Sequence, residues 1–152
     1  MDLRDTNMPL TQNFATFFVE DLYFGIEVSR VQEVLRSQEM TRVPLAPGVL
    51  RGLINLRGQI VAAIDMRERL GLGSRRPGAD PMNMIVRSDD GAVSLLVDEI
   101  GDVIPAAEES FEPRPGTISA SWKELVEGVY KLDGRLLLVL DTEKTLQIQT
   151  AL

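Results

Sequence analysis

The chain has 152 residues, and 23 acidic against 16 basic side chains give it a net charge of −7. Such an acidic surface repels phosphate backbones, so nucleic acid is not an expected partner. The sequence contains neither Cys nor His. These absences exclude disulfides and thiol chemistry and remove the commonest general base and metal ligand, which counts against catalysis.

No uninterrupted apolar run reaches the length of a membrane-spanning helix, and residues 1–10 lack the basic start and apolar core of a signal peptide. We therefore expect a cytoplasmic protein that is not inserted into a membrane. At this length and with 44% hydrophobic residues, a single domain is expected.

The N-terminal part predicts a flexible tail over residues 1–13 and then a hairpin of two strands, Phe14–Val19 and Leu22–Val28. Ser29 and Gln32 fit a capping box, and apolar residues at spacings of three and four continue to Leu35. This pattern predicts a short helical turn. The following segment, residues 40–48, contains two prolines and is expected to be a loop.

The next unit, residues 52–72, reads GLINLRGQIVAAIDMRERLGL. Its two apolar runs flank Arg57-Gly58, which predicts a two-strand hairpin with a tight turn. Asp65 with Glu68 three residues later predicts a capped helix that ends near Gly71. The run from Gly73 to Pro81 is the clearest linker of the chain. Four arginines near it are interpreted as a solvated helix end and linker: Arg67, Arg69, Arg75 and Arg76.

Beyond the linker, two further hairpins are expected, at 82–97 with an Asp-Asp-Gly turn and at 127–140 with an Asp-Gly turn. Residues 105–116 are expected to form an irregular loop, residues 122–126 one helical turn, and residues 143–148 a final helix capped by Asp141 or Thr142. Hairpins at short intervals predict an all-β fold, and the linker suggests two small barrels that share one seam.

Several motifs extend this interpretation. They are the NLRG of residues 55–58, the VQE of residues 31–33, the LVD of residues 96–98 and the KLDGR of residues 131–135. In order and spacing these motifs resemble the CheW family, the coupling proteins of bacterial chemosensory arrays, along residues 14–146. The resemblance departs from the family where Ala62-Ala63-Ile64 precede Asp65, a position at which a proline and two branched residues are common.

The resemblance implies two five-stranded SH3-like barrels packed together, with short helices that include one at the C-terminus. The CheW-like domain would cover residues 14–152, with one subdomain at about 14–76 and another at about 81–152, and the termini exchanged between barrels remain an open alternative. It also implies a non-catalytic adaptor without a cofactor, recruited to membrane-associated arrays. The partners would be the helical tip of a chemoreceptor and the regulatory domain of a CheA-type histidine kinase.

Two alternatives stay open. A specialised or competing CheW-like protein of a non-chemotactic pathway would bind only one of the two partners. A small enzyme is the other, and the missing His and Cys oppose it. Asp89-Asp90 are interpreted as turn residues rather than paired catalytic carboxylates. Asp98, Glu99 and Asp102 lack the spacing of a calcium loop and are interpreted as an exposed strand end, so no metal site is predicted.

Arg57 is the first candidate binding residue, and from the residues alone a solvated arginine and a partner contact are equally admissible. By resemblance, Arg57, Asn55 and Gly58 belong to the receptor-facing end of the first barrel. Asn55 is expected to bond to the hairpin backbone. Gly52 and Gly58 are expected to provide backbone freedom.

A second candidate surface comprises Val28, Val31 and Val97. Taken alone, an apolar stripe at this spacing is typical of a core. By resemblance, these positions line a groove between the barrels that accepts a receptor helix, with Glu33 as a charge at its rim. For the kinase, the candidate is the proline-ordered loop that contains Val43, Pro44 and Leu45.

Overall fold

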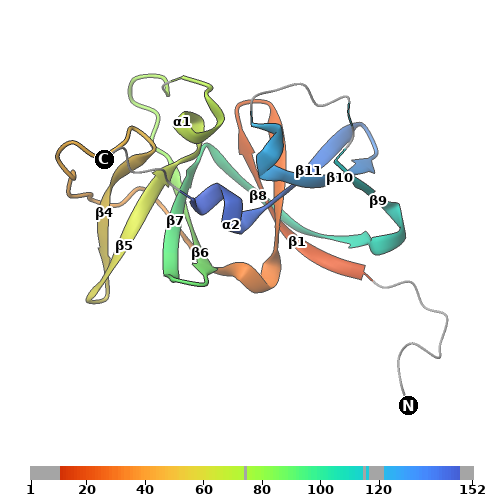
Figure 1. Ribbon diagram of the computed structural model, residues 1–152, viewed down its shortest axis with the longest axis horizontal. Helices are drawn as coiled ribbons and strands as arrows, with labels where there is room; N and C mark the ends of the chain where they lie inside the picture. The colour runs from red at the N-terminus through yellow and green to blue at the C-terminus, as the bar shows by residue number, and fades with distance from the viewer. Residues whose placement is uncertain (1–10, 74, 115, 117–121, 148–152) are drawn as a thin grey trace, which may run out of the picture.

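The computed structural model describes residues 11–73, 75–114, 116 and 122–147. Its strands form two sheets that lie side by side along the long axis of the molecule (Figure 1). The six-stranded sheet has the order β8-β1-β2-β11-β10-β9, and the five-stranded sheet has the order β3-β6-β7-β5-β4. The all-β prediction of two packed units with few short helices is therefore confirmed, although one unit has a sixth strand.

The strands of the six-stranded sheet come from both ends of the chain. They are β1 (Thr11–Val19), β2 (Leu22–Glu27), β8 (Glu99–Ala107), β9 (Phe111–Pro113), β10 (Val126–Leu132) and β11 (Arg135–Leu140). The five-stranded sheet takes the middle of the chain. Its strands are β3 (Val31–Leu35), β4 (Leu50–Leu56), β5 (Gln59–Asp65), β6 (Met82–Ser88) and β7 (Gly91–Val97).

This division corrects the predicted subdomain boundary near residues 77–80. Those residues connect two elements of the same five-stranded unit, because β6 and β7 join β3, β4 and β5. The chain passes between the sheets before β3 and again at Asp98. The parallel pair of β2 with β11, in register at Phe24 and Leu138, ties the N-terminal strands to the C-terminal ones.

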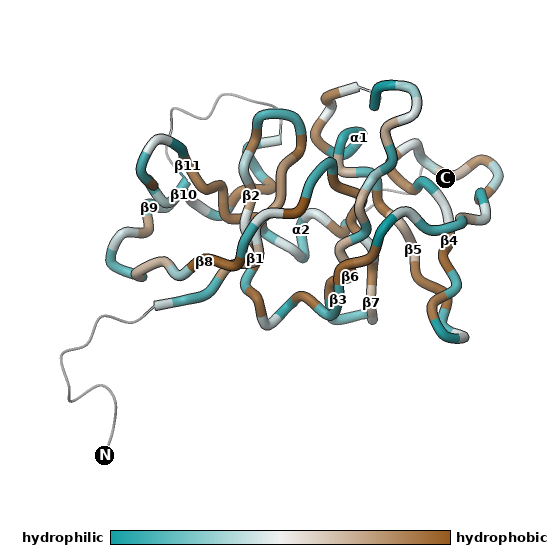
Figure 2. Tube along the Cα trace, turned by 180° about the vertical axis from the view of Figure 1, so that it is seen from behind, coloured by the Kyte–Doolittle hydropathy of each residue, from teal (hydrophilic) through white to brown (hydrophobic). Residues whose placement is uncertain are grey.

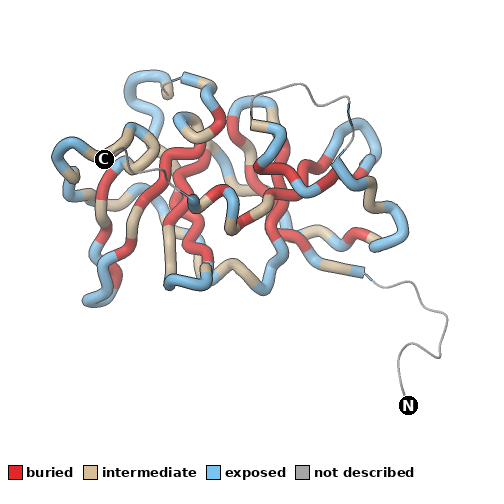
Figure 3. The backbone as a smooth tube through the Cα atoms, viewed as in Figure 1, coloured by how far each residue is buried: buried red, intermediate tan, exposed pale blue. Residues whose placement is uncertain are grey.

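Alternation along each strand produces three hydrophobic cores. On β1, Phe17 and Val19 face a core shared by both sheets, while Phe14 faces a separate core of the six-stranded sheet. On β7, Leu95 faces the shared core and Leu96 faces a separate core of the five-stranded sheet. Figure 3 shows the resulting buried positions along the strands in the middle of the molecule.

The two α-helices are short and capped. Helix α1 (Met66–Leu70) begins after Asp65, whose carboxylate accepts a hydrogen bond from the Arg67 backbone N–H, and it ends at Gly71 with φ of 72°. Helix α2 (Thr142–Leu146) begins after Asp141, which accepts from the Lys144 N–H. Asp65 as the cap of α1 and Asp141, one of the two predicted candidates, as the cap of α2 are confirmed. The capping box predicted with Glu68 does not form, because the Asp65 N–H donates to the Val49 carbonyl at 2.8 Å. Among the residues described, neither helix nor any other is long and apolar enough to cross a membrane.

Other predictions of local structure require correction. Residues 11–13, placed in the tail, belong to β1, since Gln12 pairs with Ala106, while residues 1–10 lie outside the described residues. The expected loop over 105–116 contains the end of β8, a 3₁₀ turn η3 (Glu108–Ser110) and β9. The helical turn η4 (Lys123–Leu125) is confirmed, and the final helix is one residue earlier than expected, with residue 148 outside the described part.

Candidate functional site

The β4–β5 hairpin carries the candidate residues Arg57, Asn55 and Gly58. A two-residue loop joins the strands, and both of its residues have positive φ, 50° at Arg57 and 87° at Gly58. These values are those of a type I′ turn, in which Asn-Gly is favoured and arginine is not. The Asn55 side-chain oxygen accepts the Gly58 N–H at 3.0 Å, so the predicted backbone role of Asn55 is confirmed.

Arg57 is held over the opposite edge of the same sheet. Its guanidinium forms an ion pair with Glu33 on β3, although β3 and β4 are the two outer strands of the five-stranded sheet. The hydrogen bond between the two side chains raises the pKa of Arg57 and lowers the pKa of Glu33. The Arg57 side chain remains 67% exposed and that of Glu33 23% exposed. In Figure 2 the tip of this hairpin is hydrophilic.

The sheet also closes on itself beside this pair. Thr41, which follows β3, exchanges two backbone hydrogen bonds with Leu53 of β4, at 2.9 and 2.8 Å. Gly52 makes this approach possible, because a Cβ at this position would lie 2.9 Å from the Thr41 carbonyl oxygen. Gly52 is therefore required for a close approach of two backbones rather than for the freedom of φ that the sequence suggested.

The three valines of the predicted groove do not share one surface. Val28 is in the 3₁₀ turn η2 (Val28–Arg30) and is 40% exposed. Val31 starts β3, pairs with Val86 and packs partly against the shared core. Val97 is fully buried in that core. This corrects the predicted groove position of Val97, because a side chain without exposed surface cannot contact a partner.

The helical stripe predicted for residues 28–35 is also wrong beyond its first turn. Only Val28–Arg30 are helical, and residues 31–35 form β3, in which exposure alternates with period two. Val34 is accordingly exposed and is not part of the predicted stripe. Alternation over five residues is too short to be distinguished by sequence pattern from a helical turn.

The loop before β4 presents Leu45 to solvent. Its side chain is fully exposed, and its backbone has a φ of 62°. A positive φ is unfavourable for a residue with a Cβ. Because the Leu45 side chain is not buried, no hydrophobic packing offsets this cost. The Ala46 N–H donates to the Val43 carbonyl at 3.3 Å, and the Leu50 N–H donates to the Pro47 carbonyl at 2.9 Å, so the loop is fixed at both sides of Leu45.

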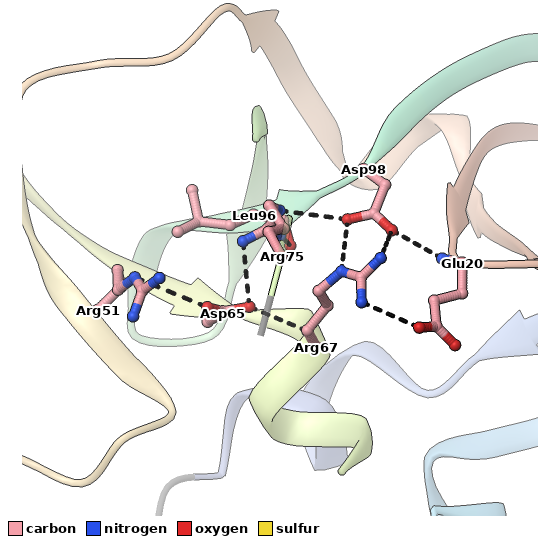
Figure 4. Close-up of polar contacts among 7 residues, drawn as sticks. All are labelled: Glu20, Arg51, Asp65, Arg67, Arg75, Leu96 and Asp98. Carbon is pink, nitrogen blue, oxygen red and sulfur yellow. Dashed lines mark hydrogen bonds and ion pairs between the residues drawn. The ribbon is translucent and has the colours of Figure 1, made fainter. Parts of the chain in front are cut away.

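A cluster of charged residues lies where the two sheets meet (Figure 4). Arg67 of α1 makes two hydrogen bonds to the Asp98 carboxylate, at 3.0 and 2.8 Å, and also pairs with Glu20. Arg75 lies 3.2 Å from Asp98 and 3.5 Å from Asp65. The Arg75 side chain is only 8% exposed. Its Nε lies within ion-pair distance of the Asp98 carboxylate but has no hydrogen bond of acceptable geometry to any described residue.

The cluster corrects two interpretations of the sequence. Arg67 and Arg75 are not solvated linker residues, and Asp98 is not merely an exposed strand end. Burial raises the pKa of the Asp98 carboxyl, but hydrogen bonds from Arg67 and from the Glu20 N–H, with the charges of Arg67 and Arg75, outweigh it and hold the pKa below its usual value. Sequence could not reveal the cluster, because Glu20 and Asp98 are far in the chain from the arginines that they contact.

The acidic turn residues predicted near residue 90 have a structural position. Asp90 lies in the β6–β7 turn, where the Ser88 hydroxyl accepts its backbone N–H at 3.2 Å, so the turn interpretation is confirmed. Within the described ranges, no group of three or more acidic side chains is arranged to hold a metal ion. Among the described residues, the Arg57–Glu33 pair and the Leu45 loop are two exposed features available for binding.

Comparison with known proteins identifies the family. The model of the CheW-like domain matches residues 13–150. The chain belongs to the CheW family. Among its CheW relatives, the chemotaxis protein CheW of Bacillus subtilis is 29% identical over 140 residues, which are 92% of this chain and 90% of that protein. The chemotaxis protein CheW of Rhizobium meliloti is 27% identical over 127 residues, 84% of this chain and 82% of that protein.

The fold agrees with a solved CheW structure. The crystal structure of the scaffolding protein TtCheW from Thermoanaerobacter tengcongensis superimposes with a TM-score of 0.79 and 31% sequence identity, over 88% of this chain and 90% of that one. The resemblance that the sequence motifs suggested is therefore confirmed over nearly the whole chain.

Proposed function

We propose that this CheW-family chain is a non-catalytic chemotaxis adaptor that couples a chemoreceptor to a CheA-type histidine kinase. Family membership and the scaffolding protein of similar fold support the adaptor role. The observation that supports a binding role most directly is the Arg57–Glu33 pair. Arg57 occupies a turn position that arginine disfavours and keeps most of its side chain exposed, and strain of this kind is concentrated at functional sites.

On the receptor side, we assign direct contacts to Arg57, Glu33 and Val28, which all retain exposed surface. Asn55 and Gly58 act indirectly, because they hold the turn that orients Arg57. Val31 positions β3 through its packing against the shared core. The receptor would bind through its cytoplasmic helical tip. In this mode an amphipathic helix places its apolar side chains as anchors in the contact, and charged residues lie at the rim.

On the kinase side, the proposed contact is the loop of Val43, Pro44 and Leu45. A fully exposed leucine on a loop with two prolines is a preorganised apolar anchor, and preorganisation reduces the entropy lost on binding. Two contacts on one small rigid body would hold the kinase and the receptor in fixed geometry. The resulting effective concentration, rather than any reaction, is what the adaptor contributes at the membrane-associated array.

A three-component sedimentation assay tests the proposal. Receptor-bearing membranes and the CheA-type kinase of the same cell are mixed with wild-type protein or with Arg57→Glu. The wild type should bring kinase into the membrane pellet. Arg57→Glu should still bind kinase in solution but should lose at least about tenfold in recovery on membranes, since it places a negative charge where a cation is required.

Lys131→Glu provides the matched control. Lys131 is also an exposed cation paired with a glutamate, Glu112, but it lies on the six-stranded sheet. The Lys131→Glu variant should bring kinase into the membrane pellet as the wild type does. If the wild type binds kinase without bringing it to receptors, the protein is the competing or specialised CheW-like protein, and if it binds neither partner, the adaptor proposal fails.

A further inference from the structure

A basic hollow of about 360 Å³ lies between the loop that follows β3, the strand β4 and the linker after α1. All the charged side chains that line it are arginines, and none of the acidic side chains that the structure describes does so. The four are Arg42, Arg51, Arg75 and Arg76. The chain as a whole has a net charge of −7, so the hollow is a positive site on an acidic protein.

Arg75 is the buried member of this set. Its side chain is only 8% exposed, and a guanidinium has five N–H donors. Among the described residues, those donors make one hydrogen bond, from Nη2 to the Leu96 carbonyl at 3.3 Å. The Nε has none, and Nη1 lies 3.5 Å from the Asp65 carboxylate. A buried guanidinium with so few hydrogen bonds loses hydration without full compensation, and an anion in the hollow would supply further acceptors.

Two carboxylates lie behind the arginines and do not line the hollow. Asp65 is 3% exposed and lies 3.7 Å from the Arg51 Nε and 3.5 Å from the Arg75 Nη1, and both arginines extend toward it in Figure 4. Asp98 accepts two hydrogen bonds from Arg67 in addition to its ion pair with Arg75. These carboxylates therefore position the guanidinium groups and leave the surface of the hollow positive.

The rest of the lining suits an anion that is carried by other atoms. Ser37 and Gln38 add neutral polar groups, and Met40, Pro81 and Leu96 add apolar surface. Apolar walls lower the local dielectric constant and so strengthen the attraction between arginine and an anion. A hollow of this size admits a phosphate group together with several of the atoms that carry it.

We propose that this hollow binds a phosphate group, borne by a small soluble compound or by a phosphorylated side chain. Guanidinium groups pair with phosphate through parallel hydrogen bonds, and the oxygens of the dianion can engage more than one arginine at once. A carboxylate, with one charge and two oxygens, would bind more weakly. A nucleic acid would bring many phosphates to an acidic chain, so the site suits single phosphate groups. The inference goes beyond the proposed adaptor role and does not depend on it.

An NMR titration of the ¹⁵N-labelled full chain tests the site directly. The probes are inorganic phosphate and acetate, each added at constant ionic strength in a buffer without other oxyanions. Phosphate should shift the backbone signals of Arg75 and Arg76 and the Arg75 Nε–H signal in a saturable way. It should bind at least about tenfold more tightly than acetate. Shifts that do not saturate, or equal affinity for the two anions, would overturn the proposal.

A second arm of the titration identifies the source of the phosphate. N-acetyl-phosphoserine-N-methylamide carries the group on a side chain. Tighter binding of this compound than of inorganic phosphate supports a phosphorylated side chain as the ligand, and equal or weaker binding supports a small soluble phosphate compound. The unphosphorylated serine compound should not bind, and its binding would contradict recognition of phosphate.

Variants separate the hollow from general basicity. The double variant Arg42→Gln, Arg76→Gln removes two exposed charges from the hollow and should bind phosphate at least about tenfold more weakly. The matched variant Arg87→Gln, Arg135→Gln removes two exposed arginines that do not line the hollow and should bind as the wild type does. Arg75→Lys keeps the buried charge but lacks the planar guanidinium, so it should weaken phosphate binding several-fold. Wild-type affinity in both hollow variants, or an equal loss in the matched variant, would refute the assignment.

Discussion

At the scale of single residues, Arg57 combines a structural contact with an exposed position. The Glu33 ion pair links the two outer strands of the five-stranded sheet, and yet most of the Arg57 side chain faces solvent. The sequence left two interpretations of Arg57 open, a solvated surface arginine and a partner contact, and this geometry is compatible with both. Only an experiment that restores the pair without restoring the surface can separate them.

The charge-swapped variant Arg57→Glu, Glu33→Arg provides that experiment. It rebuilds an ion pair between the same strands but reverses the charges that a partner meets. If Arg57 contacts the receptor, the double variant should fold like the wild type and remain as defective in membrane recruitment as Arg57→Glu. Recovery of recruitment by the double variant would show that the pair serves only the fold.

Gly52 is a second position where one residue determines local structure. Gly52→Ala places a Cβ 2.9 Å from the Thr41 carbonyl oxygen and 3.1 Å from the Met40 Cβ. Overpacking against backbone cannot be relieved by a rotamer change, so we expect a loss of about 1–3 kcal/mol in the free energy of unfolding. Urea denaturation measures it. Gly134→Ala is unsuitable as a control because its φ is 82°, whereas Gly48→Ala, whose added Cβ meets among the described atoms only the Glu68 carboxylate group, no nearer than 3.6 Å, should be nearly neutral. Equal losses in both variants would refute the explanation.

At the scale of elements, the loop between β3 and β4 holds Leu45 in a conformation that favours asparagine or glycine. Leu45→Asn should therefore raise the free energy of unfolding by about 0.5–1 kcal/mol, since it relieves the cost of positive φ. If the loop binds the kinase, the same variant should bind kinase more weakly. The control variant Leu136→Asn alters an exposed leucine on β11 and should leave kinase binding unchanged. If Leu45→Asn binds kinase as tightly as the wild type does, the loop is not part of the kinase interface.

The hairpins were the elements that sequence predicted best. Turn residues such as Arg57-Gly58 and Asp133-Gly134 lie between apolar runs, and turn geometry depends on these local residues alone. The prediction of a helical turn over Val28 to Leu35 was wrong beyond the first three residues. Pairing with β6, which is a long-range contact, decides between strand and helix in this segment. The strand β9 was missed for the same reason, as its three residues are held only by β10.

At the scale of the whole molecule, sheet membership could not be predicted from the linker. The run from Gly73 to Pro81 has the composition of a domain boundary, but β5 on one side and β7 on the other are parallel neighbours in one sheet. Parallel pairing requires a long connection, and here that connection comprises α1, this linker and the strand β6. The burial of Arg75 in that connection could not be predicted either, because its carboxylate partner Asp98 comes only after two further strands, β6 and β7.

The cluster around Asp98 connects the two sheets. Asp98 lies between β7 and β8, Arg67 follows the five-stranded sheet's β5, and Glu20 is in the β1–β2 turn of the six-stranded sheet. Asp98→Asn should lower the free energy of unfolding at pH 7 by roughly 1–2 kcal/mol, because it weakens partly buried, charge-assisted hydrogen bonds.

The loss should depend on pH with a defined sign. The pKa of Asp98 is lowered in the folded protein, so its contribution is complete above the pKa of the unfolded chain and is lost as pH falls through the folded value. Denaturation of wild type and Asp98→Asn should therefore converge as pH falls below about 4. A difference that stays constant with pH would contradict the role of the ionised carboxylate.

Kinase autophosphorylation shows whether this CheW-family protein transmits the state of a receptor to a kinase, as proposed. The rate is followed with receptor-bearing membranes, with and without the receptor's ligand, in the presence and absence of the protein. We predict that the rate responds to ligand only when the protein is present and that Arg57→Glu abolishes the response while Lys131→Glu retains it. If the rate does not respond to ligand in the presence of the wild-type protein, the protein does not couple the receptor to the kinase.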